Sequence, residues 1–342
     1  MTLTAVDCFC GAGGISLGLT RAGFDIRLAF DNDQIAVDTH RKNIGGHAEV
    51  LDATTLSGQA ILELAGLGAG QLDLLAGGPP CQGFSLQRRG SREDPRNRLV
   101  LRYLDWIDVI QPKAFLIENV AALGGVRGRE VVTAVTDHAT SLGYSIDSRI
   151  LDASAFGIPQ VRRRMFLVGL RDGETFSWPK VSRQKPMTVR QAFAGLPSPP
   201  TDGKPHPEYA NHYREARLSM LNLERIKHVP EGGGRENLPE HLVLQCHRGT
   251  HRHLDTYGRL AWDLPAVTIT ARFDSFTRGR FGHPVENRSI TLREGARLQS
   301  FPDDFTFLGN REEGARLIGN AVPPRLAYLL GKQLAVALRA TC

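Results

Sequence analysis

Short apolar runs alternate with helical patterns along the first 170 residues. Compact apolar runs bounded by Gly, Pro and charged residues are typical of strands buried on both faces of a parallel sheet. Strands that alternate with helices predict a doubly wound, Rossmann-like α/β sheet, which binds ligands at the carboxyl ends of its strands. The predicted strands are Thr4–Phe9, Ile26–Phe30, Leu72–Ala76, Ala114–Ile117, Tyr144–Leu151 and Met165–Leu170, and helices are expected up to Ala22 and over Gln34–Asn43.

The chain changes character after about Trp178. Gly195–Pro207 holds five prolines in thirteen residues, which predicts a linker or extended loop. Residues 204–300 carry fifteen Lys or Arg and eight of the eleven histidines without a steady period, so a smaller, irregular, basic domain is expected. The apolar helical pattern of Ala315–Leu338 could pack back on the first domain. The predicted divisions are 1–180, 181–285, 286–310 and 311–342.

Charge is unevenly distributed along the chain. Residues 1–80 carry four basic and nine acidic side chains, whereas the remainder has 38 basic and 27 acidic ones. This division fits a small-ligand domain joined to a polyanion-binding surface, although ordinary surface charge explains it equally well. The five scattered cysteines predict no disulfide scaffold and suggest a reducing cytoplasm. No apolar run approaches the roughly 20 residues of a membrane span.

A glycine-rich turn follows the first predicted strand. Gly11, Gly13 and Gly14 would let backbone N–H groups approach a ligand at a helix N-terminus, and Asp31 at the end of the second strand could accept hydrogen bonds from a ribose diol. The pattern lacks the third glycine of the dinucleotide fingerprint. It therefore favours S-adenosylmethionine over a nicotinamide cofactor, with a tight structural turn as the alternative.

Three further motifs follow predicted strands or begin them. Cys81, between Pro79-Pro80 and an arginine-rich stretch, suits a nucleophile better than a small buried side chain. Glu118 leaves an apolar strand and could donate a proton, although a solvated strand end is the simpler interpretation. In Gln160–Arg164, alternation along a strand would aim Arg162 and Arg164 at one cleft, where guanidinium groups could hold a phosphate or a polar base; a solvated basic strand end is equally compatible.

Taken in this order, the motifs form a specific combination. The chain resembles the bacterial DNA (cytosine-5) methyltransferases of the modification-methylase type nearly from end to end. The resemblance lies in the glycine turn and in five further segments, which are Pro79–Ser85 (PPCQGFS), Glu118–Val120 (ENV), Gln160–Arg164 (QVRRR), Arg293–Asp303 (REGARLQSFPD) and Gly319–Pro323 (GNAVP). The variable target-recognition region of the family would fall at about residues 181–285.

The resemblance implies an S-adenosylmethionine site. Phe9 would stack near the adenosine and sulfonium, Asp31 would hold the ribose, and Asp52 would accept the adenine amino group. The family's ribose carboxylate is usually Glu, so Asp31 is a shorter substitute. Leu99 would pack on the adenine, and Asn320 with Ala321 would close over the methionine end. The implied cofactor residues are Phe9, Gly11, Ala12, Gly13, Gly14, Asp31, Asp52, Pro79, Leu99, Asn320 and Ala321.

The resemblance also implies the chemistry. Cys81 would add to C6 of a cytosine, Glu118 would supply a proton to N3, and Arg164 would hold the O2 edge, with Arg162 as the second choice and no metal. The base would be flipped out of double-stranded DNA, and the loop at residues 87–98 would close behind it. Implied DNA contacts are Gln82, Ser85, Arg88, Arg89, Asn119 and Arg272. The enzyme would be a monomer at the prokaryotic nucleoid, with a possible companion restriction endonuclease that forms no stable complex with it.

Other interpretations compete with this one. Cys246, His247, His251 and His253 could bind zinc by residue type, but their spacing matches no common zinc pattern. A tRNA cytosine-5 methyltransferase would share the catalytic residues; the Cys-Phe-Thr tripeptide of that branch is here Ser275-Phe276-Thr277. A DNA-binding protein on an inactivated scaffold would not need Cys81, Glu118 and Arg164 together. A nicotinamide oxidoreductase explains neither the Cys81 segment nor the arginines.

Overall fold

The protein divides into two compact units. The structure, a computed structural model, describes residues 2–80, 98–125, 128–173, 175–215, 218–245 and 255–340. One unit, here called the sheet unit, comprises Met1–Asp152, Arg163–Val181 and Val322–Cys342. The second unit comprises Ala153–Arg162 and Ser182–Ala321. Each unit is described by itself below.

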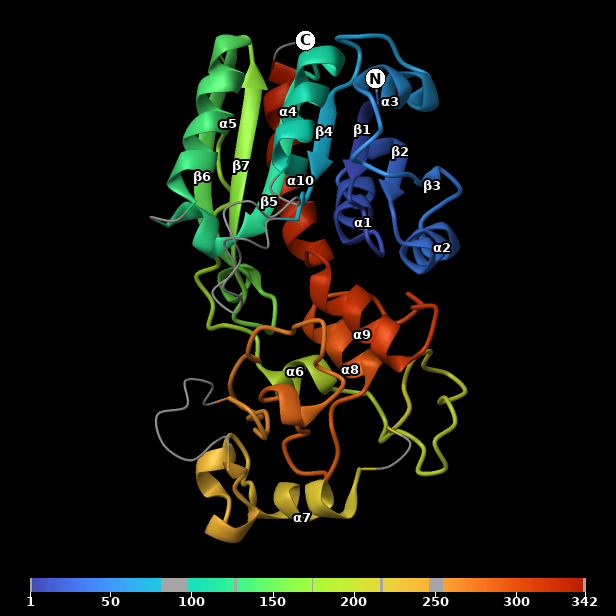
Figure 1. Cartoon of the computed structure of the whole chain (residues 1–342), viewed down its shortest axis with the longest axis vertical. Helices are drawn as coiled ribbons and strands as arrows, with labels where there is room; N and C mark the ends of the chain where they lie inside the picture. The colour runs from blue at the N-terminus through green and yellow to red at the C-terminus, as the bar shows by residue number, and fades with distance from the viewer. Residues whose placement is uncertain are drawn as a thin grey trace. The chain divides into compact units, whose positions relative to one another are not determined.

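The sheet unit is built on a seven-stranded mixed sheet in the order β3-β2-β1-β4-β5-β7-β6 (Figure 1). Chain order reverses between β1 and β4, because β1 pairs with β2 on one side and with β4 on the other. A reversal of this kind opens a crevice at the carboxyl ends of the two strands, which is where open α/β sheets bind ligands. The strands are β1 Leu3–Cys8, β2 Phe24–Asp31, β3 Ala48–Val50, β4 Leu74–Gly77, β5 Ala114–Val120, β6 Tyr144–Asp152 and β7 Arg163–Arg171.

The strand β7 departs from the predicted parallel arrangement. It runs antiparallel to both β5 and β6. Only residues 153–162 connect β6 to β7, and a parallel neighbour needs a longer crossover, usually a helix. The expectation of parallel strands was therefore wrong at this edge, whereas β1 to β5 pair in parallel as predicted.

Helices pack against the sheet and against one another. The helices α3, α4 and α5 join the strands in one buried apolar cluster, in which Tyr103 and Trp106 of α4 are fully buried. Close packing joins α1 to α10, because a Cβ added at Gly18 would lie 2.4 Å from the Cβ of Ala327. The helices of this unit are α1 Gly14–Arg21, α2 Gln34–Asn43, α3 Gly58–Ala65, α4 Arg98–Ile110, α5 Arg129–Ser141 and α10 Pro324–Ala340.

The second unit has little regular structure among its described residues, as the sequence predicts. Its helices are α6 Val189–Phe193, α7 Met220–His228, α8 Leu292–Leu298 and α9 Arg311–Asn320, together with short 3₁₀ turns. Buried arginines satisfy carbonyl groups that a helix or sheet would otherwise pair; Arg293 donates to the carbonyls of Ala210, Pro302 and Phe305.

The apolar pattern predicted over Ala315–Leu338 forms two helices rather than one. The helix α9 ends at Asn320 and α10 begins at Pro324. Proline has no N–H to donate inside a helix but suits the first helical position, so the chain stops and restarts here. The first helix belongs to the second unit and the other belongs to the sheet unit. Among the described residues, no helix is both long and apolar enough to cross a membrane.

Candidate active site

The glycine turn after β1 has an unusual backbone. Phe9, Gly11 and Gly13 all have positive φ angles of 58°, 51° and 95°. A non-glycine residue in this region is uncommon, and strain of this kind is concentrated at ligand sites. A Cβ at Gly13 would lie 2.3 Å from Cδ1 of Ile44, whereas one at Gly11 would meet nothing within 4 Å. Gly11 therefore faces open space, and Gly13 has no room for a side chain.

The carboxylate of Asp31 links this turn to the end of β2. Its Oδ2 accepts a hydrogen bond from the Gly11 N–H at 3.0 Å, and its Oδ1 accepts one from the Asp33 N–H at 3.1 Å. Burial raises the pKa of Asp31 above its ordinary value, although these N–H groups oppose the rise. Each carboxylate oxygen has further lone pairs for a ligand hydroxyl.

The side chain of Asp52 is exposed and locally fixed. Its Oδ1 accepts from the backbone N–H and the hydroxyl of Thr54, both at 2.8 Å, and these bonds lower the pKa of Asp52. The preceding Leu51 N–H donates to the Asp31 carbonyl at 3.0 Å. Asp31 ends β2, and Asp52 follows the end of the neighbouring strand β3. Both carboxylates therefore lie at the carboxyl ends of the strands, where a ligand of this sheet would bind.

Aromatic rings line the apolar side of the turn. The Phe9 ring lies 6.2 Å from that of Phe30 and 5.8 Å from that of Trp106. The Trp106 Nε1–H donates to the Leu56 carbonyl at 2.9 Å, which fixes the indole. Leu99, on the same helix as Trp106, is half-buried against this cluster. Sequence reasoning missed Trp106, because a buried aromatic on a helix reads as ordinary core.

On the other side of the reversal point, β4 and β5 bring a second set of residues together. The Asn119 Nδ2–H donates to the Pro79 carbonyl at 2.9 Å. A Cβ at Gly78 would lie 3.1 Å from Oε2 of Glu118, so the absence of a side chain lets the loop approach that carboxyl. Cys81 follows closely, but Cys81, Gln82, Ser85, Arg88 and Arg89 lie outside the described residues.

Glu118 and Arg164 form an ion pair. The Arg164 Nε lies 3.1 Å from Oε1 of Glu118, and the side chains are 19% and 12% exposed, respectively. The pairing of β5 with β7 brings them together, since Glu118 is opposite Phe166 and Val120 is opposite Arg164. The structure therefore places two of the three described catalytic candidates in contact.

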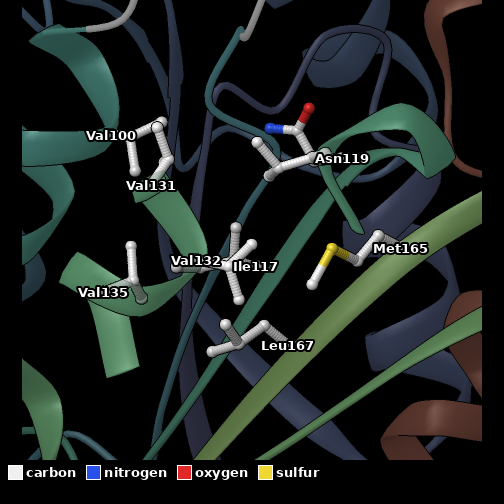
Figure 2. Close-up of a pocket in the computed structure, with 9 residues that line it drawn as sticks. Val100, Ile117, Asn119, Val131, Val132, Val135, Met165 and Leu167 are labelled. Atoms are coloured by element: carbon white, nitrogen blue, oxygen red, sulfur yellow. The ribbon is translucent and has the colours of Figure 1, made fainter. Parts of the chain in front are cut away.

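A small apolar cavity lies on the opposite face of the same two strands (Figure 2). Ile117 and Asn119 of β5 line it, as do Met165 and Leu167 of β7. Because side chains alternate along a strand, this position leaves Glu118 and Arg164 on the other face. Asn119 is the one polar residue among those described as lining the cavity. The cavity therefore offers few polar groups to orient a nucleobase, and it is a poor candidate for the substrate pocket.

Arg162 departs from the predicted arrangement. Alternation along a strand was expected to aim it with Arg164, but β7 begins at Arg163, so Arg162 precedes the strand and the alternation does not apply. Arg162 belongs to the second unit and is buried there. Its guanidinium donates to the carbonyls of Ile269, Gly319 and Ala321.

Three further predicted residues, Asn320, Ala321 and Arg272, also belong to the second unit, whereas Ala12 and Gly14 lie in the glycine turn of the sheet unit. Asn320, the last residue of α9, is exposed, and Ala321 is partly buried. Arg272 pairs with Glu312 at 3.0 Å and lines a surface pocket with Asn310 and Arg316. The candidate zinc residues Cys246, His247, His251 and His253 lie outside the described residues. Within the part of the chain that the structure describes, no group of three His, Cys, Asp or Glu side chains could hold a metal ion.

Asp7 is a second residue that sequence reasoning passed over. Its carboxyl group is fully buried at the end of β1 and accepts hydrogen bonds from the backbone N–H and hydroxyl of Ser16 at 3.0 and 2.6 Å. It therefore ties β1 to the first turn of α1 around the glycine turn. An acidic residue inside an apolar strand, four residues before a glycine-rich turn, is the signal that could have identified it.

Comparison with known proteins agrees with these features. The family model described as C-5 cytosine-specific DNA methylase matches residues 3–335. The Type II methyltransferase M1.HphI of Haemophilus parahaemolyticus is 36% identical over 337 residues, covering 97% of this chain and 86% of that protein. M.AgeI of Thalassovita gelatinovora, also a Type II methyltransferase, is 31% identical over 432 residues, covering 98% of this chain and 100% of that protein.

A solved structure supports the same fold. A protein encoded within an E. coli prophage, described as a candidate DNA modification methyltransferase, superposes with a TM-score of 0.72 at 27% identity, covering 99% of this chain and 100% of its own. This likeness confirms the predicted Rossmann-like fold.

Proposed function

The chain belongs to the C-5 cytosine-specific DNA methylase family, and from that premise we propose that it methylates C5 of a cytosine flipped out of a specific duplex DNA sequence. The methyl donor would be S-adenosylmethionine, and Cys81 would form a transient covalent bond to C6. Membership of the family makes the protein a DNA methyltransferase, and this mechanism is the proposal.

One observation carries the proposal. The Pro79 carbonyl is bonded to the Asn119 amide, and Gly78 passes beside the Glu118 carboxyl, which is itself paired with Arg164. The chain leading to Cys81 thus passes beside a carboxyl group that is itself paired with a guanidinium group. These are the groups that a nucleophilic attack on a pyrimidine needs beside the thiol, as an acid and as a hydrogen-bond donor to O2.

The chemistry follows from the weak nucleophilicity of C5. Addition of the Cys81 thiolate to C6 forms an S–C bond and pushes the ring electrons toward C5. Glu118 would lie near N3, donate a proton there and prevent a full negative charge on the ring. Arg164 would orient Glu118 and bind O2. After methyl transfer, which would leave the cofactor as its thioether, a base removes the C5 proton, the returning electrons break the S–C6 bond and release Cys81, and N3 gives its proton back to Glu118.

The residues around the glycine turn fit an adenosyl ligand. Gly11 faces open space, the Asp31 carboxylate has lone pairs to spare, and Phe9 offers an aromatic surface that can attract a cation. When bound, S-adenosylmethionine supplies a methyl group on a sulfonium for the activated C5. Asp31 would bind the ribose, Asp52 the adenine amino group and Leu99 the adenine ring, with Ala12, Gly14 and Pro79 lining the site. Asn320 and Ala321 would close over the methionine end.

Double-stranded DNA is the proposed partner. Residues 181–285 would recognise the target, with Arg272 as a DNA contact there, and Gln82, Ser85, Arg88 and Arg89 as contacts near the flipped base. Asn119, predicted as a further contact, is buried on the face of β5 opposite Glu118 and bonded to the Pro79 carbonyl, so it would support the loop rather than touch DNA. We expect a monomer acting at the bacterial nucleoid, where its substrate is. The names of the relatives support a restriction–modification role, with a companion endonuclease that forms no stable complex.

Bisulfite sequencing of DNA from expressing cells tests this function directly. The wild type should protect cytosines within one short sequence, Cys81→Ser should abolish protection, and Cys342→Ser should preserve it. A duplex containing 5-fluorocytosine should trap a Cys81 adduct that survives detergent. Methylation that persists in Cys81→Ser, or labelling of tRNA in place of DNA, would contradict the proposal.

A further inference from the structure

A buried polar cluster in the second unit converges on the backbone around Asn320. Arg162 Nη1 donates to the Ile269 carbonyl at 2.9 Å, and its Nη2 donates to the carbonyls of Gly319 and Ala321 at 3.0 and 3.1 Å. The two carbonyls that flank Asn320 are therefore held by one nitrogen. A planar guanidinium can bridge separate segments in this way, whereas the single nitrogen of lysine cannot reproduce the fork.

Two glutamines complete this cluster. Gln299 Nε2 donates to the Ile318 carbonyl at 2.7 Å and to the Ala321 carbonyl at 3.3 Å. Its Oε1 accepts from Gln160 Nε2 at 2.9 Å, and Gln160 Oε1 accepts from the Ile269 N–H at 2.8 Å. Both amides are completely buried. Buried amides with satisfied donors and acceptors make a rigid and specific network.

The same segment is fixed sterically. A Cβ at Gly319 would lie 2.2 Å from the carbonyl carbon and oxygen of Thr270, so the last turn of α9 rests directly on that backbone. Thr268 Oγ1 also donates to the Val161 carbonyl at 2.8 Å. Residues 160–162, 268–270 and 318–321 thus form one packed unit, which we call the Arg162 clamp.

We propose that Arg162 is a positioning residue for methyl transfer, holding Asn320 and Ala321 in the orientation that binds the cofactor. The inference rests on the proposed function, in which these two residues close over the methionine end of S-adenosylmethionine. It assigns Arg162 a role that differs from the substrate contact implied by the family resemblance. Asn320 is exposed while both flanking carbonyls accept hydrogen bonds from Arg162, an arrangement that leaves its side chain available to a ligand.

The test compares two buried arginines of the second unit in the full-length protein. Arg162→Lys should raise the Kd for S-adenosylmethionine, measured by calorimetry, about tenfold or more, because bonds from a charged donor are lost. The kcat at saturating cofactor should change much less. Arg259→Lys is the matched control, since Arg259 is also buried and donates to the carbonyls of Val229, His283 and Ile226, none in the clamp.

The control separates positioning from general destabilisation. Arg259→Lys should lower Tm comparably but leave the cofactor Kd within about twofold. An unchanged Kd in folded Arg162→Lys would overturn the proposal, as would a large fall in kcat at an unchanged Kd, which would place Arg162 at the substrate. Gln299→Met, of similar length, should also raise the Kd and serves as the test if Arg162→Lys fails to fold. A wild type that binds cofactor but methylates no DNA would instead contradict the proposed function.

Discussion

Asp7 offers a quantitative test of how the sheet carries the glycine turn. Its carboxyl group is completely buried, and Oδ2 accepts both hydrogen bonds from Ser16, whereas Oδ1 has no partner among the described residues. Burial raises the pKa of Asp7 from 3.8 to about 7, against the opposing effect of Ser16. We predict that Asp7→Asn removes a pH-dependent loss of stability, because asparagine can accept the Ser16 bonds and does not ionise.

The sign and size follow from proton linkage. Between the two pKa values the folded protein keeps a proton on Asp7 that the unfolded chain releases, so its free energy of unfolding falls as pH rises. From about pH 5.5 to about pH 8 this loss amounts to about 2 kcal/mol for one group with these pKa values. The stability of Asp7→Asn relative to wild type should therefore increase by about 2 kcal/mol over that range.

Urea unfolding followed by tryptophan fluorescence measures this difference at each pH. The difference between the two proteins matters rather than either curve, because other carboxyl groups titrate in both. Asp52→Asn is the control: Asp52 is exposed and its pKa is lowered, so its difference curve should be flat over the same range. A flat curve for Asp7→Asn would refute the assignment of a buried, largely protonated carboxyl at this site.

Three further predictions follow from single contacts. Gly319→Ala should lower stability by about 1–3 kcal/mol or more in urea unfolding, because its Cβ would overlap the Thr270 backbone; a neutral result would mean that α9 shifts readily. Arg288 lowers the pKa of Glu294 to about 2 although burial opposes it, so the free energy of unfolding should fall as pH drops below about 4.5. Glu294→Gln should lower stability by about 3–5 kcal/mol at neutral pH and should remove this loss of stability at acid pH. Glu118→Gln should lower kcat by about 10²–10⁴ without changing the cofactor Kd, and a Kd effect of similar size would argue against a role as the acid.

The central part of the sheet could be predicted from sequence because burial on both faces leaves an unbroken apolar signal. The run at 114–117 lies within β5, and the pattern over 34–43 is the helix α2 as observed. The direction of β7 could not be predicted in the same way, since a buried strand has the same apolar content whichever way it runs between its neighbours β5 and β6. The short strand β3 offers too few residues for any period to show.

The candidate site, too, could be predicted only in part from the sequence. The pairing of Glu118 with Arg164 follows from two strands being neighbours, and sequence motifs placed both residues at strand ends. Trp106 escaped notice because its importance comes from burial and from partners distant in sequence, which no local motif records. Arg162 was misjudged for a simpler reason: alternation holds only inside a strand, and the strand starts one residue later.

Charge in the second unit illustrates what composition cannot reveal. The abundance of arginine there favoured a polyanion-binding surface, yet Arg225, Arg259, Arg288 and Arg293 are buried. Each donates hydrogen bonds to backbone carbonyls, so these guanidinium groups replace secondary structure in an irregular chain. Alanine variants at these positions should therefore be destabilised. Weaker DNA binding by such a variant would report the loss of folded protein and would not identify a phosphate contact. DNA contacts should instead be sought among arginines such as Arg272, whose side chain remains 42% exposed.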